Sequence, residues 1–104
     1  MASQIDELVR MRDVETLYEL MTEDEEWLTQ LDAAEGLSKL GDRRGYEFVL
    51  TALLSDDDAI REVAQEIIDS PELAKLRDEI EAERQRARRE HFASARKRLQ
   101  NGGK

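Results

Sequence analysis

The sequence predicts an all-α fold, and three observations support that prediction. The chain of 104 residues has one proline and five glycines, which is less turn chemistry than a sheet protein would need. Ala, Leu, Glu and Arg, which favour helices, dominate the composition, and β-branched residues are few. Apolar residues recur at three- and four-residue spacing in one segment after another. We therefore expect one small helical domain with a modest core.

The first two helices are predicted from capping residues and short apolar faces. Ser3 can cap a helix over Gln4–Met11, because its hydroxyl can accept a hydrogen bond from a free N–H group of the first turn. Asp13 is the next candidate cap. The helix after it has an apolar face formed by Val14, Leu17, Leu20 and Met21.

A third helix is predicted between an acidic turn and a glycine. Thr22 and Glu25 have the spacing of a capping box, in which a hydroxyl and a carboxylate each bond to a free backbone N–H. Gly41 suits the left-handed conformation that ends many helices. The apolar residues between them are Trp27, Leu28, Leu31, Ala34, Leu37 and Leu40.

Two further helices are predicted on either side of a second acidic turn. Asp42 starts the fourth helix, and the turn at 55–58 (Ser-Asp-Asp-Asp) ends it and caps the fifth. The apolar face of the fourth helix is Tyr46, Val49, Leu50, Leu53 and Leu54. That of the fifth is Ile60, Val63, Ala64, Ile67 and Ile68.

The last predicted helix is long and charged. Ser70 is its cap and Pro71 its first residue, and no break follows until Asn101. Up to 29 residues would give a helix roughly 43 Å long. Its first half has the apolar stripe Leu73, Leu76 and Ile80, which thins to Ala87, Phe92, Ala95 and Leu99. We expect the second half to bury little against its own body.

An internal repeat lies between residues 13 and 70. Ala33 and Leu37 align with Ala64 and Ile68 at a spacing of 31 residues. Leu17, Leu20 and Met21 align with Leu50, Leu53 and Leu54 at a spacing of 33. Ala34 and Ala64 are small where stacked helices would approach most closely, so the spacing is typical of stacked helical hairpins.

One unit of the repeat runs from Ala34 to Arg61. A helix ends in Leu-Gly-Asp, a second helix carries paired leucines, an acidic turn follows, and Ile-Arg opens the next unit. This order closely resembles the short bacterial HEAT repeat, of the subtype also found in phycobilisome-lyase-type proteins.

The resemblance implies an α-solenoid fragment of α-α hairpins whose flanking helices act as caps. It also implies a non-enzymatic protein-binding scaffold, with Arg61 in a polar ladder between repeats. Thr29 and Gln30 depart from the usual Val-Arg pair. A remote implication is an accessory role in bilin attachment, although no residue identifies a tetrapyrrole site.

Candidate catalytic and metal-binding residues are few, so we predict that the chain is not an enzyme and has no cofactor or metal. Cysteine is absent. His91 lies in the charged helix with no partner for catalysis. Ser94 and Lys97 match Ser-x-x-Lys by chance, without its companion motifs. The acids at 56–58 lack the ligand spacing of an EF-hand and are better explained as a helix cap.

Charge divides the chain into two predicted parts. Residues 1–83 carry 8 Lys and Arg against 24 Asp and Glu, whereas residues 84–104 carry 8 Lys and Arg against a single Glu. The net charges are −16 and +7. We expect a HEAT-like domain over 1–83 and a basic helical extension with a flexible end over 84–104. The candidate contacts of the extension are Arg84, Arg86, Arg88, Arg89, Phe92, Arg96, Lys97 and Arg98.

Several partners fit this pattern. Another protein could bind the polar positions of the helices at 13–21, 43–54 and 71–83, with Tyr18 and Trp27 as aromatic anchors unless they pack in the core. A homodimer could pair 84–98 of one chain with the acidic segment 72–83 of another. Nucleic acid or an anionic surface is an alternative partner for the tail, disfavoured by the acidic body. The tail could also simply be solvated. No apolar run or signal peptide is apparent, so we expect a soluble cytoplasmic protein.

Overall fold

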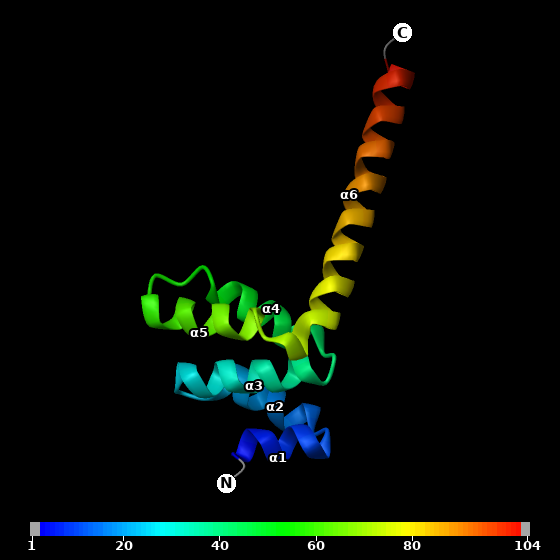
Figure 1. Ribbon diagram of the computed structural model, residues 1–104. Coiled ribbons are helices and arrows are strands. Elements are labelled where there is room, and N and C mark those ends of the chain that lie inside the picture. Colours follow the sequence, from blue (N-terminus) through cyan, green and yellow to red (C-terminus); the bar gives the residue numbers. More distant parts are fainter. Residues whose placement is uncertain (1–2, 103–104) are drawn as a thin grey trace.

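The computed structural model describes residues 3–102, which form six α-helices that pack together and one short 3-10 turn (Figure 1). The elements are α1 (Gln4–Met11), α2 (Val14–Glu23), α3 (Trp27–Lys39), α4 (Arg43–Ala52), α5 (Asp58–Ile68), η1 (Pro71–Leu73) and α6 (Ala74–Gly102). No strand occurs among these residues. The predicted all-α class is therefore confirmed.

Polar side chains begin four of the helices as the sequence predicts. Ser3 and Asp6 form a capping box at α1, with the Ser3 hydroxyl accepting from the Asp6 N–H at 3.1 Å. Asp13, Asp42 and Asp57 cap α2, α4 and α5, each accepting from a backbone N–H group of the first turn. These local hydrogen bonds satisfy donors that the helices leave unpaired.

The expected capping box at Thr22 is wrong. Helix α2 continues through Glu23, and the Thr22 hydroxyl donates back to the Tyr18 carbonyl at 2.9 Å. Thr22 is therefore an internal residue of α2, whereas a residue that caps the next helix would have non-helical φ and ψ. Helix α3 instead begins after Glu26, which makes no side-chain cap, while Asp24 accepts from the Glu26 N–H at 2.9 Å.

The expected ends of two other helices also need correction. Helix α4 ends at Ala52, and Leu54, expected on its apolar face, is 83% exposed. The chain tightens there into a 3-10-type turn, with the Leu54 N–H donating to Thr51 at 3.0 Å, which rotates the side chain outward. Pro71 starts the short η1 turn, without a side-chain cap from Ser70, and α6 begins only at Ala74.

Helix α3 lies at the centre of the body and packs against α1, α2, α4 and α5. Its residues Leu31, Ala33, Ala34 and Leu37 are almost fully buried. Gly41 ends the segment in the left-handed region, at φ 82°, as predicted. The core therefore surrounds α3.

Helix α6 starts in this core and then leaves it (Figure 1). Leu73, Leu76 and Ile80 are buried, whereas Ala95 is the only half-buried residue from 81 to 100 and the rest are exposed. The molecule measures 68 × 31 × 25 Å and its radius of gyration is 17.9 Å, against about 13 Å for a compact chain of this length. The expectation that the second half buries little is confirmed. Within the described residues α6 runs for 29 residues to Gly102, slightly beyond the expected break at Asn101. The flexible end predicted within 84–104 is not tested beyond that residue, because 103–104 lie outside the described residues.

Candidate interaction surfaces

The second half of α6 is a basic helix surrounded by solvent. Among the described residues, no carboxylate lies within ion-pair distance of six of the predicted tail contacts, and all six are exposed: Arg86, Arg88, Arg89, Arg96, Lys97 and Arg98. Phe92 and Leu99 are 65% and 77% exposed. This segment therefore combines cationic and apolar groups on an unpartnered helix.

Arg84 differs from the other tail residues because it is held by the body. Its guanidinium donates to the Glu47 carboxylate of α4 at 3.1 Å. One residue earlier, Glu83 accepts from Arg43 at 2.6 Å. Two ion pairs therefore join α4 and α6, and each helix supplies the arginine of one pair and the glutamate of the other. Hydrogen bonding from Arg43 lowers the pKa of Glu83. The change of charge sign along α6 thus coincides with its last contacts to α4.

Tyr18 lies half-exposed beneath a guanidinium. The Arg44 Cζ atom is 4.3 Å from the centre of the Tyr18 ring, which is a cation–π contact. Asp42 holds Arg44 in place through two hydrogen bonds, at 3.0 and 2.7 Å, and these lower the pKa of Asp42. Tyr18 is therefore a preorganised surface aromatic, 38% exposed, and not a core residue.

A shallow groove surrounds Tyr18 between α2 and α4. It has a volume of about 410 Å³. Met21 and Phe48 form its apolar part, while Arg43, Arg44, Glu47 and Thr51 form its polar edge. The groove therefore brings together residues from two of the segments predicted as interaction surfaces.

Trp27 is at the first turn of α3 and is 37% exposed. Its neighbour Leu28 is 47% exposed. The interpretation of Trp27 as an ordinary core residue is therefore wrong. Because α3 begins at this point without a side-chain cap, its first turn lies at the edge of the body and presents two large side chains to solvent.

A second groove, between α3 and α5, was not predicted. It has a volume of about 650 Å³ and is lined by Leu28, Asp32, Glu35, Val63, Glu66, Ile67, Asp69, Ser70 and Pro71. Four carboxylates stand among its apolar residues, two from α3 and two from the end of α5. The sequence does contain a signal for this groove. Asp32 and Glu35 are three residues apart, as are Glu66 and Asp69, and this spacing places both acids of a pair on one side of their helix.

Two of these carboxyl groups have perturbed acidity. Burial, followed by the negative charge of Asp6, raises the pKa of Asp32. Burial is also the first cause of the raised pKa of Glu35, where the positive charge of Lys39 acts in the opposite direction. Burial in the α3–α5 groove therefore disfavours the charged forms of these two carboxyl groups, and Lys39 offsets this only in part.

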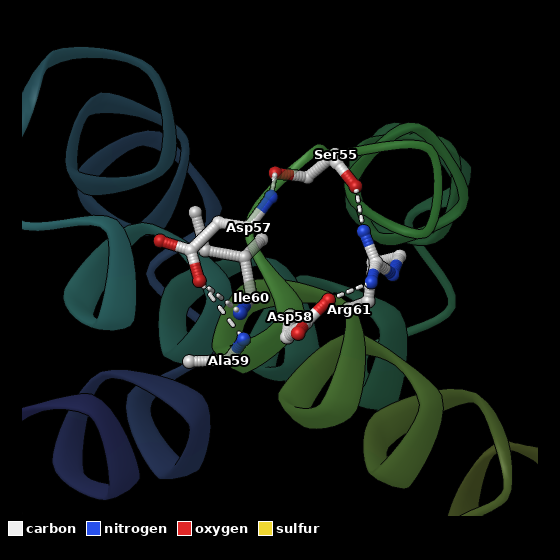
Figure 2. A network of polar contacts seen from close by, with 6 residues as sticks. All are labelled: Ser55, Asp57, Asp58, Ala59, Ile60 and Arg61. Carbon is white, nitrogen blue, oxygen red and sulfur yellow. Dashed lines mark hydrogen bonds and ion pairs between the residues drawn. The ribbon is translucent and has the colours of Figure 1, made fainter.

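Arg61 lies in the first turn of α5, next to the loop that precedes this helix (Figure 2). Its guanidinium donates to the Ser55 carbonyl at 2.6 Å and forms an ion pair with Asp58. Asp57 accepts from the N–H groups of Ala59 and Ile60, at 2.8 and 3.4 Å. Arg61 therefore stabilises the turn at the start of its own helix. The resemblance to HEAT repeats implied instead that it takes part in a polar ladder between repeats.

The residues weighed for catalysis or metal binding lie apart from the grooves. His91 is exposed, edge-on to the neighbouring Phe92 ring. Ser94 and Lys97 are exposed on the free part of α6. Over residues 3–102, no group of three or more His, Cys, Asp or Glu is arranged to hold a metal ion. In the same part of the chain, none of the helices combines the length and apolarity that a membrane span requires.

In comparisons with protein-family models, curated proteins and solved structures, nothing matches the chain. The functional argument therefore depends on the surfaces themselves.

Proposed function

We propose that the protein is a non-enzymatic interaction module, a short HEAT-like scaffold whose basic C-terminal helix is a second contact site. The order of packing supports the HEAT-like part. Helices α2 and α4 occupy equivalent positions in the repeat alignment, as do α3 and α5, and α3 packs against all three of the others. Ala34 and Ala64, the small residues expected at close helix approaches, are fully buried.

The free second half of α6 supports the binding role most directly. Residues 81–100 gain almost no burial from the body, whereas helices in proteins owe most of their stability to the packing of an amphipathic face. The exposed side chains of Phe92 and Leu99 would be stabilised by burial against an apolar surface of a partner. Large side chains that become buried at an interface dominate its energetics.

An affinity pull-down from the native host tests the proposal. The bait is the full chain, compared with the double variant Phe92→Glu/Leu99→Glu and with Leu54→Glu as control. All three positions are exposed, so the body should remain folded. We expect a host protein that the wild type and the control retain and the double variant loses. Identical retention by all three baits would overturn the role of α6 in binding.

The competing partner for the tail is nucleic acid or another anionic surface. Six cationic side chains without an ion-pair partner among the described residues favour it, whereas the body, with a net charge of −16 over 1–83, repels a long polyanion. A mobility-shift assay at low salt separates the two. We expect no shift of DNA or RNA, and a shift that Arg88→Glu/Arg96→Glu abolishes would favour the competing partner.

A further inference from the structure

The free face of α6 has an apolar stripe between cationic residues. Phe92, Ala95 and Leu99 follow at spacings of three and four, so they lie along one face of the helix. Arg88 and Arg96 stand one turn before and one turn after Phe92. A surface that accepts this face must therefore be apolar in the middle and negatively charged at its edges.

The α3–α5 groove has that composition. Leu28, Val63, Ile67 and Pro71 supply its apolar surface, and Asp32, Glu35, Glu66 and Asp69 supply the carboxylates. Leu28 is 47% exposed, so apolar area is available for contact. Burial is the first cause of the raised pKa of both Asp32 and Glu35, and the positive charge of Lys39 offsets it only in part. An incoming arginine would favour the charged forms of these carboxylates.

The two surfaces also match in length. Along α3, the groove is lined at Leu28, Asp32 and Glu35, and the first and last of these are seven positions apart. Phe92 and Leu99 of the α6 stripe are also seven positions apart. Both distances are roughly 10 Å at the helical rise. Two turns of α6 therefore fit alongside the two turns of α3 that line the groove.

The α6 helix cannot reach the groove of its own chain. Pro71 lines the groove, and α6 leaves from Ala74 as one continuous helix that points away from the body (Figure 1). Phe92 is 21 residues after Pro71, or roughly 32 Å along the helix. The occupant of the groove must therefore come from another molecule.

We propose that the occupant is a second copy of this chain, whose α6 lies in the α3–α5 groove with Phe92 and Leu99 against its apolar residues and Arg88 and Arg96 facing its carboxylates. The inference rests on the proposed function, because it takes α6 as a contact site and names its partner. Charge complementarity favours a second copy, since the cationic helix and the anionic groove occur once each in every chain. Mutual insertion would satisfy both surfaces in a closed dimer.

The alternative pairing of two α6 helices, 84–98 against 72–83, is less favourable. The large apolar residues of the acidic half, Leu73, Leu76 and Ile80, are buried against their own body. Phe92 of the other chain would then face mainly charged side chains, since Ala82 is the one exposed apolar residue in 72–83. The groove offers both the opposite charge and the apolar contact.

Sedimentation velocity with charge-reversed variants tests the proposal. The tail variant is Arg88→Glu/Arg96→Glu and the groove variant is Asp32→Lys/Glu66→Lys. Wild-type protein should dimerise at low salt, and each variant alone should raise the dissociation constant by at least about tenfold, because like charges meet. An equimolar mixture of the two variants should form a heterodimer, since each reversed tail then meets a reversed groove and each native tail a native groove.

Asp78→Lys/Glu79→Lys is the matched control, because it reverses two exposed acids of α6 that do not line the groove. It should dimerise like wild type. A control that abolishes the dimer, combined with a mixture that fails to associate, would overturn the groove and favour α6–α6 pairing.

Wild-type protein that stays monomeric at low salt and high concentration would also overturn the second copy as partner. That result leaves the proposed function standing if the Phe92→Glu/Leu99→Glu variant still loses a different host protein in the pull-down. Circular dichroism of each variant checks that a lost dimer does not result from unfolding.

Discussion

Gly45 of α4 lies so close to α3 that a Cβ atom at this position would stand 2.4 Å from the carbonyl oxygen of Ala34. The same atom would be 2.7 Å from the Leu37 Cβ. Both neighbours belong to the centre of the body, and Gly45 itself is buried. The contact between these two helices therefore depends on the missing side chain.

Gly45→Ala should lower the free energy of unfolding by about 1–3 kcal/mol, the usual cost of overpacking. The clash involves backbone, which cannot move aside without separating α3 from α4. Urea unfolding followed by circular dichroism measures the effect. Gly36→Ala is the matched control, because its closest neighbours are the ends of the Val9 and Leu17 side chains, at 2.9 and 3.3 Å. Both variants gain similar helix propensity, so equal stabilities would contradict the backbone clash.

Arg77 should stabilise the junction between α5 and α6. Its half-buried guanidinium donates to the Ile68 carbonyl at 2.6 Å, at the end of α5. Arg77→Ala leaves that carbonyl without this donor, at an expected cost of about 1–3 kcal/mol. Hydrogen exchange should increase first in the last turn of α5. Glu79→Ala, at an exposed position of the same helix, should change stability by less than about 0.5 kcal/mol, and an equal loss in both variants would argue against the contact.

The ion pairs Arg43–Glu83 and Arg84–Glu47 should orient α6 more than they stabilise the fold. All four side chains are about half exposed, so solvent screening leaves each pair only a small contribution to the free energy of unfolding. The chain has no cysteine, so spin labels can be placed at Leu54→Cys and Leu99→Cys alone. With Arg43→Gln/Glu47→Gln, the distance distribution between the labels should broaden while the unfolding midpoint hardly changes. An unchanged distribution would show that packing at Leu73, Leu76 and Ile80 suffices.

Asp32 should make the protein more stable at mildly acidic pH. Its pKa is raised in the folded state, chiefly by burial. At a pH just above the ordinary pKa range of carboxyl groups, the native state therefore binds more protons than the unfolded state. Stability from this group therefore falls as pH rises through that window. Asp32→Asn should raise the urea midpoint at pH 7, and the gain should shrink as the pH falls to about 4. These measurements use dilute protein at high salt, which keeps it monomeric, and a constant or negative effect would contradict the prediction.

Stability should decline again at lower pH. The pKa of Asp42 is lowered, first by hydrogen bonding from the Arg44 side chain, so its contribution is present above the unfolded pKa and is lost as pH falls through the folded pKa. Asp42→Asn should remove part of that acid sensitivity while keeping a cap at the start of α4, because Asn caps helices about as well as Asp. Acid titrations of the two proteins that run in parallel would show that another group is responsible.

Local chemistry made much of the fold predictable. Ser3, Asp13, Asp42 and Asp57 cap helices in the structure because a side-chain oxygen two or three residues before a free N–H is a short-range arrangement. The predicted helix boundary at Thr22 was wrong. Its hydroxyl could either cap the next helix or donate to the Tyr18 carbonyl within α2, and in the structure it donates to Tyr18. Sequence patterns do not rank such competing hydrogen bonds.

The candidate surfaces were predictable only in part. The exposed basic half of α6 follows from its charge and from the thinning of its apolar stripe, both of which are properties of one helix. The α3–α5 groove joins Asp32 to Glu66, 34 positions apart, and no pattern within either helix places them together. Arg84 was predicted as a contact of the basic extension because it belongs to the basic run. In the structure it pairs with Glu47 of the body instead.

The sequence by itself determined the helical class, most helix starts, the buried stripe of α6 and the separation of an acidic body from a basic end, because each depends on residues within a few turns of one another. Three features depend on the tertiary structure alone. Tyr18 lies under Arg44, the missing side chain of Gly45 allows the main chain of Ala34 to approach closely, and carboxylates of α3 and α5 share a groove. Those features arise where helices distant in sequence approach, and side-chain packing across the interface sets their distance and rotation.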